Sequence, residues 1–138
     1  MGKVNWHAAS SKCGALGGEL MVLDDYEDYL KTTMFLKSQG LLASEDWKNS
    51  LWAGIHRLGN GVDFRKSKNG EDPFLPWVPG EPNNGNPEEA CVAFGNYLKT
   101  NGYIDFQCTS ENPYVCQHPK IRENYLCIKR EYFVETIF

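Results

Sequence analysis

The sequence has no apolar run approaching the roughly 18 residues that a membrane-spanning helix needs, so we expect no membrane span. Its start, Met1 to Asn5, has no apolar stretch resembling a secretory signal. It also has no basic cluster, because 14 Lys and Arg are outnumbered by 18 Asp and Glu, for a net charge of −4. A surface that follows nucleic-acid phosphates needs clustered cations, so nucleic acid is not an expected partner.

Catalytic motifs are also missing. There is no G-x-S-x-G nucleophile motif, and His7, His56 and His118 do not have the spacing of zinc ligands. Two carboxylates such as Glu81 and Asp105 could in principle form a glycosidase pair. However, a general acid needs an apolar setting that raises its pKa, whereas acidic residues clustered with an amide are typical of metal ligands. We therefore predict that the protein is not an enzyme.

What the sequence does contain is the composition of one globular domain. The chain has 138 residues, of which 41% are hydrophobic and 13% aromatic. Disordered chains are poorer in aromatic residues and richer in charge, and a length near 140 residues accommodates a single core. We expect one folded domain with no second unit.

Five cysteines are spread along the chain, and none forms a C-x-x-C pair that would suggest zinc or redox chemistry. This pattern favours structural disulfides, which persist in oxidising compartments, and so indicates an extracellular, secreted protein whose leader is absent from this sequence. The alternative is a cytosolic protein with reduced, buried cysteines. The cysteines are Cys13, Cys91, Cys108, Cys116 and Cys127.

Two helices are predicted in the first third of the chain. Asn5 is a suitable N-cap for a helix that ends at Gly17 and Gly18, and a short strand follows over 19–23. Asp24 or Asp25 caps a second helix that ends at Gly40. Its core face is predicted to comprise Tyr26, Leu30, Thr33, Met34 and Lys37, with Leu36 near the edge.

Short strands and one long loop are predicted for the rest of the chain. Residues 51–55 form an apolar run typical of a buried strand, and 91–94, 103–106 and 114–116 suit further short strands. Between Arg57 and Pro87 there is little periodicity, and a loop of that length in a compact domain is usually functional. The predicted fold class is therefore α+β.

Several motifs, in order, resemble the C-type lectin family. Residues 6–13 (W-x-x-A-x-x-x-C) are similar to its first helix, 51–55 (LWAGI) to its W-I-G-L core strand, and 81–83 to its E-P-N triplet. Residues 102–108 (GYIDFQC) resemble G-x-W-N-D-x-x-C, and 113–117 (PYVCQ) resemble the closing strand. The chain most resembles small secreted lectins of the invertebrate type. The resemblance implies a disulfide-stapled C-type-lectin-like fold with two helices, short antiparallel strands and a long calcium and ligand loop.

The resemblance also implies the disulfide pairs Cys13 with Cys116 and Cys91 with Cys108. It covers roughly Lys3 to Gln117, and we expect residues 1–118 to form the domain, with the first strand, which in the family precedes the position of Val4, truncated. Residues 119–138 are an unmatched tail in which Ile121, Tyr125, Ile128 and Tyr132 have near-helical spacing. A missing strand leaves its partner with an open edge, so a dimer through this exposed edge, or through Cys127, is a hypothesis.

The candidate site residues are Glu81, Asn83, Glu89 and Asp105. Calcium takes six to eight oxygen ligands, and the family places these four positions around one calcium ion, with a cis peptide bond before Pro82. In the family the sugar hydroxyls bind the calcium and the same side chains. We therefore expect these four residues to bind both one Ca²⁺ and the sugar.

E-P-N at residues 81–83 resembles members that prefer mannose-type sugars over galactose. Ile104 stands where sugar-binding members have asparagine, so an amide oxygen and two donors are missing and the calcium site is weakened. Asn84, Asn86 or Asn101 are candidates to replace that oxygen.

Positions that would hold the family's auxiliary calcium carry Arg57, Gly61, Asn84 and Ala90, so at most one calcium site is expected. Two functions remain open. The first is a calcium-dependent lectin whose partners are mannose-type glycans or glycoproteins. The second is a degenerate lectin-like module that binds proteins without calcium or sugar.

Overall fold

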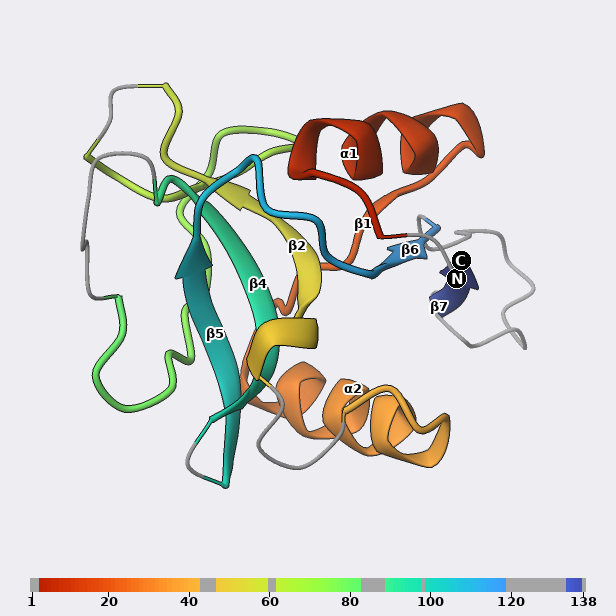
Figure 1. Ribbon diagram of the computed structural model, residues 1–138, viewed down its shortest axis with the longest axis vertical. Helices are drawn as coiled ribbons and strands as arrows, with labels where there is room; N and C mark the ends of the chain where they lie inside the picture. Colours follow the sequence, from red (N-terminus) through yellow and green to blue (C-terminus); the bar gives the residue numbers. More distant parts are fainter. Residues whose placement is uncertain are drawn as a thin grey trace.

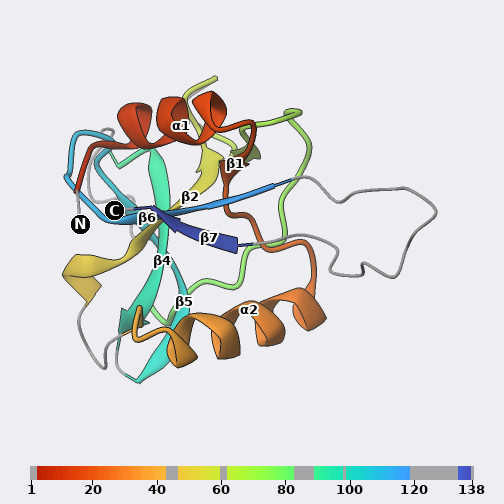
Figure 2. The same cartoon turned by 90° about the vertical axis from the view of Figure 1, so that its right-hand side faces the viewer.

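A computed structural model describes residues 3–42, 47–59, 62–82, 89–97, 99–118 and 134–137. Two helices, α1 (Trp6–Ala15) and α2 (Tyr26–Ser38), cover opposite sides of a central sheet, as Figure 1 and Figure 2 show. The short 3-10 helix η1 (Trp47–Asn49) precedes the second strand. The strands are β1 (Glu19–Leu20), β2 (Leu51–His56), β3 (Arg65–Lys66), β4 (Cys91–Tyr97), β5 (Thr100–Phe106), β6 (Tyr114–Gln117) and β7 (Val134–Ile137). The predicted α+β class is confirmed.

The helix boundaries follow the predicted caps. The Asn5 side chain accepts a hydrogen bond from the Ala8 N–H at 2.8 Å, and the Asp25 carboxylate accepts one from the Asp28 N–H at 2.8 Å. Gly17 and Gly40, which follow the two helices, have φ of 82° and 73°, a conformation that favours glycine. Both helices therefore begin and end for reasons visible in the sequence.

The predicted core face of α2 is wrong at most positions. Thr33 is buried, but Leu36, which we placed near the edge, is fully buried in the main core. Tyr29 also packs against the core, and its hydroxyl donates to the Asn101 carbonyl at 2.7 Å. The buried stripe is therefore rotated from the predicted one by about one residue. The predicted core positions that are exposed are Tyr26, Leu30, Met34 and Lys37.

The central sheet has the strand order β1-β6-β2-β4-β5, with β3 paired to β2 and β7 paired to β6. β4 and β5 form an unbroken antiparallel ladder from the Cys91 and Phe106 pair to the Tyr97 and Thr100 pair. A Cys13–Cys116 disulfide joins α1 to β6, and a Cys91–Cys108 disulfide joins β4 to the segment after β5. These are the pairs that the resemblance implies.

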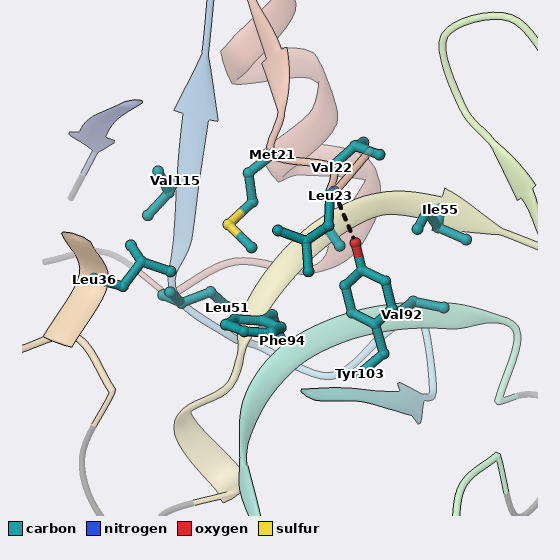
Figure 3. Packing of buried hydrophobic residues seen from close by; sticks show 11 residues of the cluster. Met21, Val22, Leu23, Leu36, Leu51, Ile55, Val92, Phe94, Tyr103 and Val115 are labelled. Carbon is teal, nitrogen blue, oxygen red and sulfur yellow. Dashed lines mark hydrogen bonds between the residues drawn. The ribbon is translucent and has the colours of Figure 1, made fainter. Parts of the chain in front are cut away.

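The main core lies between the sheet and α2, as Figure 3 shows. Within it the Tyr103 hydroxyl accepts a hydrogen bond from the Leu23 N–H at 3.0 Å. Burial raises the pKa of Tyr103 well above its usual range, so this phenol stays neutral. The cluster comprises Met21, Val22, Leu23, Leu36, Leu51, Ala53, Ile55, Val92, Phe94, Tyr103 and Val115.

The end of the chain supplies a strand that the sequence analysis does not predict. β7 pairs antiparallel with β6, from Val134 opposite Gln117 to Ile137 opposite Tyr114. The edge that we expected to be exposed is therefore covered. Cys127 and the near-helical spacing over 121–132 lie outside the described residues, and the domain boundary after residue 118 remains a prediction. None of the helices in the described ranges is long and apolar enough to cross a membrane.

Candidate functional site

Three of the four predicted calcium ligands line one pocket of about 590 Å³. These are Glu81, Glu89 and Asp105, and Ile104 lines the same pocket. The fourth residue, Asn83, lies outside the described residues. Glu81 and Glu89, which are eight positions apart, and Asp105 of β5 therefore meet at one pocket.

Asp105 is placed by the longest ladder of the sheet. It lies on β5 opposite Val92 of β4, and its neighbour Ile104 lies opposite Ala93. Asp105 is 3% exposed and Ile104 is 6% exposed. Because the β4 and β5 backbones are paired along their whole length, the Asp105 side chain starts from a rigid position.

Glu81 is placed by a segment that docks on β5. The Tyr103 N–H donates to the Pro76 carbonyl at 2.8 Å, and the Val78 N–H donates to the Tyr103 carbonyl at 3.0 Å. This approach needs glycine at Gly102, because a Cβ there would lie 2.6 Å from the Pro76 oxygen. The Glu81 N–H then donates to the Val78 carbonyl at 3.1 Å.

The peptide bond between Glu81 and Pro82 is cis, as the resemblance implies.

The backbone around Glu89 is held by hydrogen bonds with Arg57. The Arg57 side chain donates from Nε to the Glu89 carbonyl at 3.2 Å, and the Arg57 N–H donates to the Ala90 carbonyl at 2.9 Å. Arg57 thus anchors the backbone beside a residue that lines the pocket.

The donor set is suited in kind to calcium, because every candidate ligand offers oxygen. Nevertheless, no three His, Cys, Asp or Glu side chains within the described residues lie close enough together to hold a metal ion. Ile104 contributes hydrocarbon to the pocket in place of an amide. Asn101 does not replace it, because its side-chain oxygen accepts a hydrogen bond from Asn96 at 2.9 Å and the residue does not line the pocket. Asn84 and Asn86 lie outside the described residues.

Two aromatic residues that are not among the residues predicted from the sequence also line the pocket. Trp47 of η1 and Phe106 of β5 line it, with ring centroids 6.1 Å apart, and Trp47 is 40% exposed. The available signal was an isolated tryptophan within the polar run Glu45 to Asn49. Trp52, which belongs to the predicted buried strand over 51–55, is fully buried.

Comparisons with known proteins agree with this fold. The family model for the lectin C-type domain matches residues 2–118. The chain is 32% identical over 120 residues to C-type lectin 37Db of Drosophila melanogaster, a match that covers 85% of this chain and 73% of that protein.

Solved structures include the cow C-type carbohydrate-recognition domain of CD23 in the presence of a GlcNAc2Man3 oligosaccharide. That domain is 28% identical, with a TM-score of 0.64, over 83% of this chain and 80% of that chain. A Ca²⁺-dependent type II antifreeze protein has the same fold at 17% identity, with a TM-score of 0.65, over 83% of this chain and 84% of that chain. The fold therefore occurs in proteins with different roles. Taken with the two disulfides and the order of the strands, these matches show that the chain belongs to the C-type lectin domain family.

Proposed function

We propose that this chain binds mannose-type glycans through one calcium ion at the pocket lined by Glu81, Glu89 and Asp105. The observation that carries the proposal is that these three carboxylates, contributed by separate segments, line one pocket beside a cis Glu81–Pro82 bond. Calcium, when bound, would supply a cation at which sugar hydroxyls can replace water. The residues that would hold it are Glu81, Glu89, Asp105 and, from the sequence, Asn83.

The residues of the chain itself would perform the recognition. The carboxylates accept hydrogen bonds from sugar hydroxyls, and the E-P-N sequence at 81–83 supports a preference for mannose-type over galactose-type sugars. Trp47 and Phe106 offer apolar faces to the C–H groups of a sugar ring. This is a binding role, and we propose no enzymatic activity.

The natural partners would be glycans or glycoproteins outside the cell. Two disulfides support that location, because they persist in oxidising compartments. The cow domain found with an oligosaccharide supports glycan as the ligand class.

A second candidate is a protein-interaction module that binds neither calcium nor sugar. Two observations favour it: Ile104 brings no oxygen to the pocket, and the described carboxylates do not form a closed metal centre. The exposed Trp47 would then be part of a protein contact.

Retention on immobilised mannose separates the two candidates. We expect the oxidised protein to be retained in calcium, to be released by a chelator and to pass through immobilised galactose. Glu81→Gln should abolish retention, whereas Glu71→Gln, at an exposed glutamate that does not line the pocket, should leave it unchanged. Passage through the mannose column by folded wild-type protein would favour the second candidate.

Replacing Ile104 by asparagine is expected to tighten calcium binding by about tenfold, because an amide oxygen would be added beside the carboxylates. The measurement is a calcium titration of the variant, with Ile104→Leu as the matched control that adds no ligand. Because Ile104 is buried, circular dichroism must first show that the variant is folded. An unchanged or weaker affinity in the folded variant would mean that Ile104 does not occupy the ligand position.

A further inference from the structure

The pocket that the three carboxylates line continues along the sheet beyond them. Tyr97 lines the same pocket as Asp105, but the two residues lie far apart on the ladder, because Tyr97 pairs with Thr100 and Asp105 pairs with Val92. Val92 and Tyr97 are five positions apart on β4, which corresponds to about 17 Å of strand. The volume of about 590 Å³ lies within the range of roughly 300–1,000 Å³ for sites that bury drug-sized ligands. The pocket is therefore longer than a single sugar ring.

The pocket has an acidic part, formed by the carboxylates, and an aromatic part, formed by Trp47 and Phe106. Side chains of a strand alternate between its two faces, so Ile104 and Phe106 share one face of β5 and the Asp105 side chain starts from the other. Trp47 meets Phe106 with 6.1 Å between ring centroids, and its helix η1 lies against β4, as Figure 1 shows. The two parts are therefore distinct surfaces of one pocket.

A buried hydrogen-bond network holds η1, and with it Trp47, in place. The Ser50 hydroxyl donates to the Trp47 carbonyl at 2.6 Å, and the Ser50 carbonyl accepts from the Asn112 side-chain amide at 2.9 Å. Asn112 is fully buried, and its side-chain oxygen accepts from the Ser110 hydroxyl at 2.6 Å. Gly95 makes room for Ser50, because a Cβ there would collide with the Ser50 hydroxyl. The aromatic part is thus preorganised, which lowers the entropy cost of binding a ligand.

Lys48 adds hydrogen-bond donors to the aromatic part. It lines the pocket, and its Nζ lies 5.8 Å from the centroid of the Trp47 ring. An ammonium group donates and does not accept, so it suits a ligand group that accepts. Three carboxylates oppose this one cation, and the two charges of a Ca²⁺ ion would only bring the sum to zero, so no net positive charge attracts an anionic ligand. A neutral acceptor beside an apolar group is therefore the chemistry that this surface fits.

We propose that the aromatic part is a second sugar subsite, which takes an N-acetylhexosamine linked to the sugar in the acidic part. The acetamido methyl group packs on Trp47 and Phe106, and the acetamido carbonyl accepts from Lys48. The inference rests on the proposed function, because it takes the acidic part as the place of the first sugar. It goes further in naming the ligand class, a disaccharide with an acetamido group on its second ring.

Two disaccharides that differ only in their acetamido groups test the proposal. Chitobiose consists of two N-acetylglucosamine units and cellobiose of two glucose units, with the same linkage and with the adjacent equatorial hydroxyls that mannose also presents. In calorimetry of the oxidised wild-type protein with calcium, we expect chitobiose to bind about tenfold more tightly than N-acetylglucosamine. Cellobiose should bind within about twofold of glucose, because it has no acetamido group.

Substitutions in the aromatic part locate the gain. Trp47→Ala and Lys48→Met should each abolish most of the gain of chitobiose over N-acetylglucosamine. Lys12→Met, at an exposed lysine that does not line the pocket, should preserve it.

The outcomes separate this inference from the proposed function. Equal affinities for chitobiose and N-acetylglucosamine in the wild type, or a gain that survives both substitutions, would overturn the second subsite and leave calcium-dependent sugar binding standing. An equal gain for cellobiose over glucose would overturn the acetamido assignment. A gain that depends on Trp47 and persists in a chelator would support the subsite and contradict the role of calcium. Failure of folded protein to bind any of the four sugars would overturn both.

Discussion

Replacing Cys13 and Cys116 together with alanine is expected to lower the free energy of unfolding by about 4–5 kcal/mol. The disulfide joins residues 103 positions apart in a chain of 138, so its loss releases about three-quarters of the unfolded chain from a closed loop. It also connects α1 to β6, where both cysteines are fully buried. Because domains of this size are stable by about 5–15 kcal/mol, the loss would consume a large share of the total.

The measurement is urea denaturation of the oxidised protein, followed by tryptophan fluorescence. The matched comparison replaces Cys91 and Cys108, whose bridge spans 17 positions and should contribute about 3 kcal/mol on the same chain-entropy model. Equal losses for the two pairs, or a larger loss for the short bridge, would contradict the assignment of the long bridge as the main staple.

Trp52→Ala is expected to cost about 3–5 kcal/mol of stability, the range for removing a large aromatic side chain from a core. Trp52 is fully buried, its ring contacts Phe106 at 5.9 Å between centroids, and its Nε1 donates to the Val4 carbonyl at 2.7 Å. The substitution therefore leaves a cavity and removes one of the two hydrogen bonds that the Val4 carbonyl accepts, the other coming from the Asn112 N–H at 3.0 Å.

The control is Trp47→Ala, which removes the same side chain from a position that is 40% exposed. We expect it to cost less than about 1 kcal/mol, as surface substitutions usually do. Both variants are compared by urea denaturation followed by circular dichroism, since each removes a fluorophore. A Trp47→Ala loss as large as that of Trp52→Ala would mean that η1 is part of the core.

Local signals in the sequence predicted much of the fold. Asn5, Asp25 and the two glycines that follow the helices specify helix ends through interactions a few residues long. The prediction of the core face of α2 was wrong because the exposed side of this helix contains Tyr26 and Met34. Apolar character alone therefore did not identify the buried stripe. The hydrogen bond that the Tyr29 hydroxyl donates and the burial of Leu36 both depend on strands that are distant in sequence.

Only part of the candidate site was predictable from the sequence. Glu81, Glu89 and Asp105 were predicted through motif resemblance, and all three line the pocket, while their role as ligands stays a prediction. Trp47 was not found, because nothing local to η1 indicates that it meets Phe106 of β5. β7 was also missed, since the pairing of Val134 to Ile137 with β6 is a long-range match of main-chain edges that leaves little trace in side-chain pattern.

A calorimetric calcium titration of the oxidised wild-type protein tests the central claim most directly. We predict one binding event within the millimolar range that is typical of extracellular calcium modules. It should disappear in Asp105→Asn and persist in Asp63→Asn, an exposed aspartate that does not line the pocket. The absence of any binding heat at millimolar calcium in correctly oxidised, folded protein would contradict the account.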